Sequence, residues 1–264
     1  MSTRHLASQN GTGAFYELCI DLTKHHDDAT ALSETAQPAG GVGGPGYGGR
    51  MPNLLHLDSS ADLTTSRSRA ITAAFADAWR DLGDDHAVTR RDLHVDPLPH
   101  LSDSALHWPP RLRRAGDAPD PAHEALQQAL ITELVAADVV LIGAPLYNYS
   151  LPSTLKAWVD NIHLPGVTAP FDGDDQQPML GRTAVVVTSR GGSYDPGTPT
   201  AGYDHAVPVL EIVLGATLGM RVETITTNLT LSDRLPMPDE ARERAVRELG
   251  EAKEAAVASA RRLG

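Results

Sequence analysis

The sequence predicts a doubly wound α/β protein, in which a five-stranded parallel sheet carries helices on both faces. Two observations predict this architecture. Short apolar runs rich in β-branched residues, at residues 139–142 and 183–188, are typical of strands buried on both faces in the middle of a parallel sheet. Segments with helical spacing separate such runs, so strands and helices alternate from residue 53 to the end of the chain.

Composition excludes several classes of protein. The 264 residues are 41% hydrophobic, which is enough for one sizeable core. A net charge of −12 argues against binding to nucleic-acid phosphates or to anionic membranes. The lone Cys19 cannot form an intrachain disulfide and fits a reducing compartment. No membrane span or secretion signal is recognisable, so we expect a soluble, cytoplasmic protein with no nucleic-acid or membrane partner.

The first 50 residues differ from the rest. Residues 38–50 are dominated by glycine, as in flexible linkers, so we expect residues 1–50 to be a disordered extension of a folded domain at 51–264. Met51 is a candidate start of the folded unit. A G-x-G-x-x-G match at 41–46 lacks the flanking strand and helix that dinucleotide binding requires. His25-His26-Asp27-Asp28 is interpreted as solvated charge, and no metal site is predicted.

The first predicted strand, residues 53–58, is followed by a segment rich in hydroxyl groups. This segment contains Ser60, Ser66, Arg67 and Ser68, and a helix with an apolar stripe from Ile71 onwards comes next. Free N–H groups at a helix start favour anions, and serine hydroxyls add donors, so the segment is a candidate phosphate site. Ordinary helix capping by serine is the alternative interpretation.

The second strand, residues 87–91, leads into a long irregular stretch at 101–121 that contains Trp108. Loops of this length are usually functional or disordered, so the stretch either folds over a ligand or partner chain or is a mobile surface loop. A helix at 121–136, capped by Asp120, leads to the third strand at 139–142.

The third strand ends where Gly143 and Pro145 interrupt it. Ligands of open α/β sheets bind beyond the carboxyl ends of the strands. The residues there could provide flat apolar walls and an amide for a planar ring, or the tyrosines could cap the core. These residues are Leu146, Tyr147, Asn148 and Tyr149, and a helix at 151–162 follows them.

The fourth strand, residues 183–188, ends in a loop with two glycines. Glycines let a backbone approach a ligand closely and expose consecutive N–H groups, although a simple tight turn is the alternative. Tyr194, just beyond, is a candidate hydrogen-bond or proton donor, or a plain surface residue. The loop residues are Ser189, Arg190, Gly191 and Gly192; a helix at 207–218, a strand at 221–226 and a helix at 239–263 complete the chain.

Five strands in this alternation fit the flavodoxin-like strand order 2-1-3-4-5, which binds FMN at the switch between strands one and three. The loops after strands one, three and four are neighbours in that order. A hydroxyl-rich loop for a phosphate and two loops for a ring therefore converge on one flavin-shaped ligand.

Residues 51–264 resemble a known family, the FMN-dependent NAD(P)H azoreductases, also described as quinone reductases. The motifs that carry the resemblance occur in the family's order. They are Ser59-Ser60 with Ser66-Arg67-Ser68, Ala144-Pro145-Leu146-Tyr147-Asn148-Tyr149, residues 152–160, Gly166-Val167-Thr168, Thr188-Ser189-Arg190-Gly191-Gly192, Leu214-Gly215 and Leu218-Gly219-Met220.

The resemblance implies an enzyme that passes a hydride from NADH or NADPH through FMN to quinones or aromatic azo compounds by a ping-pong mechanism. It implies a homodimer with both sites at its interface. By this similarity Ser60 and residues 66–68 hold the FMN phosphate, and residues 146–149 and 189–192 border the isoalloxazine ring. Trp108, Phe171 and Tyr194 are expected to line the substrate site, and no catalytic acid or base is identified.

Three departures from the family keep alternatives open. Ala169-Pro170-Phe171-Asp172 stands where the family often has an aromatic pair, Arg67 replaces a glutamine, and the extension before Met51 has no counterpart. One alternative is a flavodoxin-like electron carrier or redox module that binds flavin without efficient turnover. Another is a tailoring reductase for one metabolite. The sequence fixes neither the physiological acceptor nor the choice between NADH and NADPH.

Overall fold

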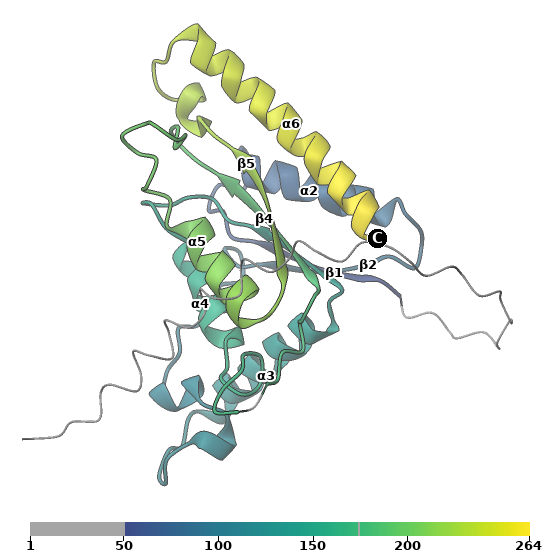
Figure 1. The fold of residues 1–264 in the computed structure, drawn as a ribbon, viewed down its shortest axis with the longest axis vertical. Helices are drawn as coiled ribbons and strands as arrows, with labels where there is room; N and C mark the ends of the chain where they lie inside the picture. The colour runs from purple at the N-terminus through teal and green to yellow at the C-terminus, as the bar shows by residue number, and fades with distance from the viewer. Residues whose placement is uncertain (1–50, 174) are drawn as a thin grey trace, which may run out of the picture. The chain divides into compact units, whose positions relative to one another are not determined.

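The computed structural model describes residues 51–173 and 175–264. The predicted disorder of residues 1–50 therefore lies outside the described residues. The described chain forms a five-stranded, all-parallel sheet of order β2-β1-β3-β4-β5, which confirms the predicted fold class and strand order (Figure 1). The strands are β1 (Asn53–Asp58), β2 (Ala87–Asp92), β3 (Val139–Gly143), β4 (Thr183–Ser189) and β5 (Arg221–Thr227).

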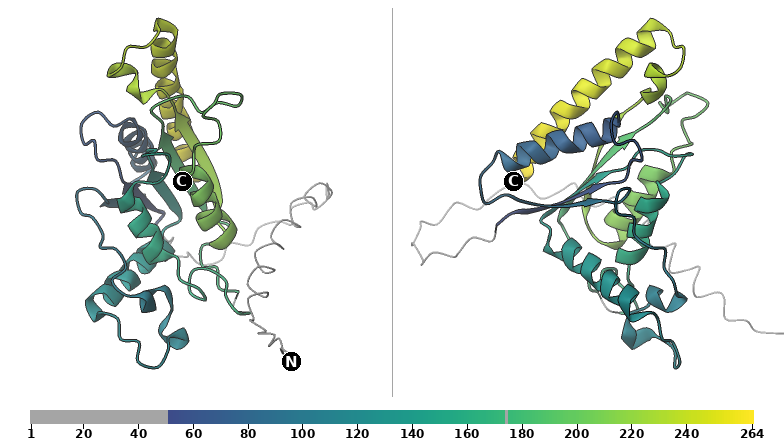
Figure 2. Two further views of the ribbon diagram at one scale, coloured as in Figure 1. Left: turned by 90° about the vertical axis from the view of Figure 1, so that its left-hand side faces the viewer. Right: turned by 180° about the vertical axis from the view of Figure 1, so that it is seen from behind.

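Helices cover both faces of the sheet. On one face lie α2 (Arg67–Arg80) and α6 (Asp239–Leu263), which pack along each other, as Figure 2 shows. On the other face lie α3 (Pro121–Ala136), α4 (Ser153–Ile162) and α5 (Ala206–Leu210). No helix of the described residues is long and apolar enough to cross a membrane.

The core consists of two apolar layers that the sheet separates. Because successive side chains of a strand point to opposite faces, Leu54 of β1 packs in the layer under α2 and α6, whereas Leu55 and Leu57 pack in the other layer. Both layers contain fully buried aromatic residues: Phe75 and Trp158, one from each layer, have no exposed surface. Burial on both faces explains the continuous apolar runs at residues 139–142 of β3 and 184–187 of β4.

The register brings the carboxyl ends of the strands together. Asp58 of β1 lies beside Gly143 of β3, which lies beside Val187 of β4, which in turn lies beside Ile225 of β5. The loops that follow these four strands therefore leave the sheet at one edge. Since β1 lies between β2 and β3, the chain reverses direction of winding here, and a crevice opens at this point in open α/β sheets.

Two segments differ from expectation. The irregular stretch at 101–121 contains the short 3-10 helices Ser104–His107 and Pro110–Leu112 and is anchored by the fully buried Leu106. The helix expected at 207–218 is α-helical only as far as Leu210, and Glu211–Thr217 is π-helical. The hydroxyl of Thr217 donates to the carbonyl of Val213, and this local bond competes with regular helical bonding.

Candidate active site

A cavity of about 570 Å³ opens at the shared carboxyl edge of β1, β3, β4 and β5; we call it the carboxyl-edge cavity. It brings together seven of the twelve residues predicted to bind the cofactor, from three separate loops. A fourth loop, after β5, also contributes. The lining residues are Ser60, Asp62, Thr65, Ser66, Arg67, Pro145, Leu146, Tyr147, Ser189, Gly191, Thr230, Leu231 and Arg234.

The start of α2 borders the cavity. Ser66 is the N-cap in an extended conformation, and its hydroxyl oxygen accepts from the N–H of Arg69 at 3.3 Å. Ser66 therefore caps the helix and also lines the cavity, so the two sequence interpretations of this segment coexist. Ser68 is fully buried, 3.1 Å from Ser66 between hydroxyl oxygens, and does not line the cavity.

The guanidinium of Arg67 donates hydrogen bonds to residues that do not line the cavity. Its Nη atoms donate to the carbonyl of Ala245 in α6 at 3.0 Å and to the hydroxyl of Ser232 at 3.1 Å. The side chain therefore ties the start of α2 to α6 and to the loop after β5. Arg67 lines the cavity as the first residue of α2, while its guanidinium donates to these protein acceptors.

The loop after β3 is a tight two-residue turn. Tyr147 and Ser150 exchange two backbone hydrogen bonds of 3.0 Å, and Asn148 and Tyr149 between them have φ of +47° and +69°. The left-handed backbone conformation costs a tyrosine about 1–2 kcal/mol, so other contacts must stabilise it at Tyr149. The carbonyl of Tyr149 accepts from the N–H of His205 at 2.9 Å, and its ring meets Tyr203 edge to face. Neither Asn148 nor Tyr149 lines the cavity.

Tyr147 connects two loops across the cavity. Its hydroxyl oxygen accepts from the N–H of Ala61 at 3.0 Å and lies 3.3 Å from the hydroxyl of Ser60. The loop after β1 and the loop after β3 are therefore joined directly at one wall of the cavity.

The Gly-Gly loop, residues 189–193, contributes Ser189 and Gly191 to the cavity. A Cβ atom on Gly191 would lie 3.0 Å from Cδ1 of Leu231, so the loop packs closely under the segment after β5. Arg190 turns away: its guanidinium pairs with Asp204 at 2.5 Å and lies over the ring of Tyr194. Arg190 and Gly192, predicted to border the ring, and Tyr194, predicted to line the substrate site, are not among the residues that line the cavity.

A buried ionic cluster supports the loop after β1, and sequence reasoning missed it. Arg69 donates from Nη2 to the carbonyl of Ser60 at 2.6 Å and pairs with both oxygens of Asp92 at 2.6 and 2.8 Å. In a trans peptide the carbonyl and the next N–H point in opposite directions. By holding the carbonyl of Ser60, Arg69 therefore fixes the direction of the Ala61 N–H, which points to Tyr147.

Asp58, at the end of β1, carries a low pKa. Burial raises the pKa of this carboxyl, but His56, Arg90 and Thr72 lower it by more, to about 2. Because the folded-state pKa is below the ordinary value of 3.8, the stabilisation is present above about pH 4 and is lost as pH falls towards 2. We expect Asp58 to contribute a loss of about 2 kcal/mol in unfolding free energy over this range.

Urea denaturation at pH 5, 4, 3 and 2 measures this contribution. Other acidic groups titrate over the same range, so the comparison is between the wild type and Asp58→Asn. The wild-type curve should fall more steeply with decreasing pH than that of the variant. Parallel curves would contradict the assignment of the low pKa to Asp58.

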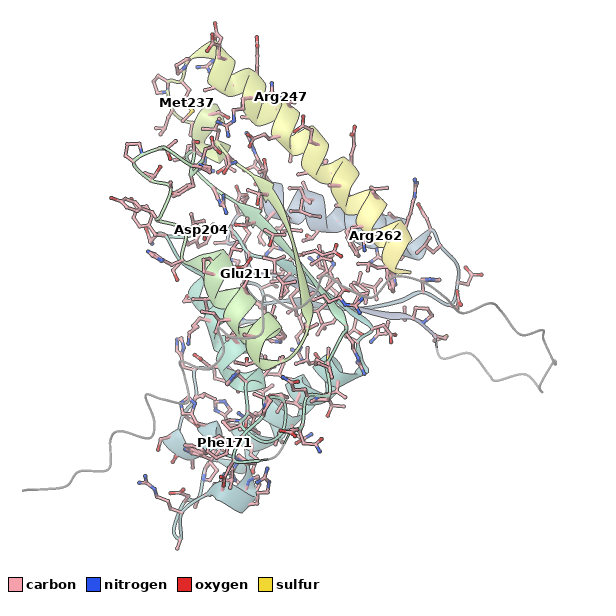
Figure 3. All side chains as sticks on the ribbon, in the orientation of Figure 1. Phe171, Asp204, Glu211, Met237, Arg247 and Arg262 are labelled. Atoms are coloured by element: carbon pink, nitrogen blue, oxygen red, sulfur yellow. The ribbon has the colours of Figure 1, made fainter. Side chains whose placement is uncertain are left out.

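Trp108 and Phe171 meet each other but not the carboxyl-edge cavity. Their rings pack edge to face with centroids 5.4 Å apart. Trp108 lines a separate cavity of about 270 Å³, formed by the stretch after β2. In Figure 3, Phe171 lies far along the molecule from the Arg247 end of α6. Neither of these aromatics, both predicted to line the substrate site, lies in the carboxyl-edge cavity formed by the loops of the same chain.

Four residues of the carboxyl-edge cavity were not singled out from the sequence: Asp62, Thr230, Leu231 and Arg234. The last three belong to the loop after β5. A signal for this loop was available, because β5 is parallel to β4 and its carboxyl end must reach the same edge. Among the described residues, no three His, Cys, Asp or Glu side chains form a group that could hold a metal ion.

The strand order and a cavity at the point where winding reverses define a flavodoxin-like protein. A family model described as "Flavodoxin-like fold" matches residues 52–252. The chain is 58% identical over 213 residues to an FMN-dependent NADH:quinone oxidoreductase of Kineococcus radiotolerans, covering 81% of this chain and 98% of that protein. It is 43% identical over 187 residues to one of Frankia casuarinae, covering 69% and 86%.

Solved structures show the same fold. An FMN-dependent NADH-azoreductase from Bacillus anthracis in complex with FMN superposes with a TM-score of 0.64 at 20% identity, covering 80% of this chain and all of the other. The chain therefore belongs to the flavodoxin-like family that includes the FMN-dependent NADH:quinone oxidoreductases.

The donor set of the carboxyl-edge cavity fits FMN. One end offers the hydroxyls of Ser60 and Ser66 at the start of a 14-residue helix, which suits a phosphate. The other end offers Pro145 and Leu146 as apolar wall, with Gly191 allowing close approach to a ring edge. The polar and apolar ends thus match the two ends of a flavin mononucleotide.

Proposed function

We propose that this protein transfers electrons from NADH, through FMN bound in the carboxyl-edge cavity, to quinones and aromatic azo compounds. The observation that carries the proposal is the convergence of the hydroxyl-lined start of α2 and two ring-sized loops on one cavity in a member of this family. When bound, FMN accepts a hydride from the nicotinamide and supplies two electrons to the acceptor. NADPH is the alternative donor.

In this proposal the residues of the chain bind and orient FMN and its reaction partners, and no side chain takes part in the reaction itself. The hydroxyls of Ser60 and Ser66 and the first turn of α2 would hold the phosphate. Leu146 and Tyr147 would border the ring on one side, and Ser189 and Gly191 on another. N–H groups of the Gly-Gly loop would stabilise negative charge on the ring, because preorganised donors favour developing charge. No side chain is assigned as acid or base.

An anaerobic spectroscopic titration tests the proposal. The purified protein is loaded with FMN, mixed with NADH, and then mixed with a benzoquinone. We expect the flavin absorbance to bleach with NADH and to recover with the quinone. Flavin binding without bleaching would instead support an electron carrier, and reduction without reoxidation by quinones or azo dyes would support a dedicated tailoring reductase. Failure to bind FMN would contradict the site.

We also propose that the protein is a homodimer in which Trp108 and Phe171 line the acceptor side of the partner's site. Three large side chains, Tyr149, Tyr203 and Ile212, are each half or more exposed, as in an uncovered interface. A dimer would also give the Trp108–Phe171 pair a role that its place in one chain does not provide. Light scattering should give twice the chain mass of 28.1 kDa. The single Cys19 supports a cytoplasmic location.

A further inference from the structure

The charges around the phosphate end of the carboxyl-edge cavity are poorly matched to a phosphate unless one further residue takes part. Asp62 lines this end, and its carboxylate accepts from the N–H groups of Thr64 at 3.0 Å and Thr65 at 2.8 Å. These bonds hold a negative charge at the phosphate end. A phosphate carries one to two negative charges at neutral pH, so Asp62 would repel it unless a cation lies nearby.

The nearest arginine in the sequence does not supply that cation. Arg67 starts α2 and lines the cavity, but its guanidinium donates to Ala245 and Ser232, which are not among the lining residues. The guanidinium of Arg69 likewise donates to the carbonyl of Ser60 and pairs with Asp92, and Arg69 does not line the cavity. Both arginines hold backbone in place rather than face the ligand.

Arg234 is placed to supply the positive charge that the phosphate end needs. It ends the 3-10 helix Thr230–Asp233 after β5, and it lines the same cavity as Ser60, Thr65 and Ser66. Its Nη2 atom lies 3.7 Å from Oδ2 of Asp62, a loose ion pair, and its side chain is 72% exposed. A long, exposed side chain with one loose partner can change partner at little energetic cost, whereas Arg67 and Arg69 cannot.

The segment that carries Arg234 is fixed relative to the ring end of the cavity. The N–H of Thr230 donates to the carbonyl of Arg190 at 3.0 Å, and Leu231 packs on Gly191. The N–H groups of Arg234 and Leu235 both donate to the carbonyl of Leu231, at 3.0 and 2.9 Å. The backbone of Arg234 is thus held at the cavity while its side chain remains free to reorient.

We propose that Arg234 is a phosphate-binding residue of the FMN site, which offsets the charge of Asp62 and donates to the FMN phosphate. This inference rests on the phosphate position proposed above. Arginine matches phosphate oxygens with paired N–H donors, so the contact adds orientation as well as charge. In this arrangement the loop after β5, and not only the serine-rich loop after β1, determines how tightly FMN binds.

The test compares FMN with riboflavin, which has the same ring but no phosphate. Dissociation constants of both flavins are measured by fluorescence quenching with the flavin-free protein and with Arg234→Gln. We expect the variant to weaken FMN binding by about tenfold or more and to change riboflavin binding by less than about twofold. Arg234→Lys, which keeps the charge but not the fork, should weaken FMN binding by an intermediate factor.

The matched control is Arg247→Gln, which removes the same charge from an exposed position on α6 where the side chain is 61% exposed (Figure 3). It should leave both constants unchanged. A second measurement does not need riboflavin binding: added salt should weaken FMN binding more steeply in the wild type than in Arg234→Gln.

Ser60→Ala distinguishes an error in the proposed position of the phosphate from an error in the assignment of Arg234. If Ser60→Ala selectively weakens FMN binding but Arg234→Gln does not, the phosphate position stands and the assignment of Arg234 is wrong. If neither variant distinguishes FMN from riboflavin and the salt dependence is unchanged, the phosphate position itself is wrong. Equal weakening of both flavins by Arg234→Gln would show a structural role and would also overturn the inference.

Discussion

Replacing Arg69 with methionine is expected to lower the free energy of unfolding by about 3–5 kcal/mol. The side chains of Arg69, Asp92 and Asp58 are all at least 86% buried, and Arg69 lies between the two carboxylates. Removing the cation leaves two buried carboxylates with less compensation. It also releases the carbonyl of Ser60, so the loop after β1 loses its fixed orientation and FMN binding should weaken as well.

Urea denaturation of the flavin-free protein measures the first effect, and FMN fluorescence quenching measures the second. Arg80→Met is the matched control, because Arg80 lies on the same helix but is half exposed and pairs only with the exposed Asp77. It should change stability by less than about 1 kcal/mol. Similar losses in both variants would show that the buried cluster contributes nothing special to stability.

Replacing Trp158 with alanine is expected to lower the free energy of unfolding by about 3–5 kcal/mol as well, for a different reason. Trp158 of α4 has no exposed surface and lies at the centre of the layer formed by α3, α4 and α5. The deleted ring leaves a cavity that the surrounding strands, paired on both sides, cannot close. Thermal or urea unfolding measures the loss, with a lowered midpoint as the expected result.

Trp108→Ala is the natural comparison, since the same side chain is removed from a site that is 36% exposed. We expect a stability loss below about 1 kcal/mol, because the ring packs chiefly on Phe171. If the pair lines the acceptor site of a dimer, this variant should reduce kcat/KM for bulky acceptors while NADH-dependent bleaching stays normal. Unchanged acceptor kinetics would contradict that role.

The fold was predictable because its central strands are buried on both faces. Residues such as Val140 and Val186 must then be apolar whichever face of the sheet their side chains point to. The result is a continuous apolar run that identifies a strand in the sequence. The edge strand β5 is partly exposed and gives a weaker pattern. Because the carboxyl ends of parallel strands lie at one edge of the sheet, the loops with Ser60, Tyr147 and Gly191 were predicted to meet. The structure shows that these three residues line one cavity.

What could not be predicted depends on contacts between distant residues. Whether Arg67 or Arg234 faces the cavity depends on where α6 and the loop after β5 dock, some 165 to 178 residues further along the chain. The role of Arg69 depends on the register that sets Asp58 beside Asp92 across two strands. Local propensity carries no information about either, so the identity of a charged residue near a helix start says little about its partner.

The packing of α6 on α2 has a consequence for the synthesis of the protein. The apolar side of α2, with Ile71 and Phe75, is synthesised well before α6, the helix that packs against it. Until α6 emerges, this side of α2 is covered by the sheet alone, and Arg67 lacks the carbonyl of Ala245 that holds the start of α2. We therefore expect stable FMN binding only after α6 has been synthesised and has packed on α2.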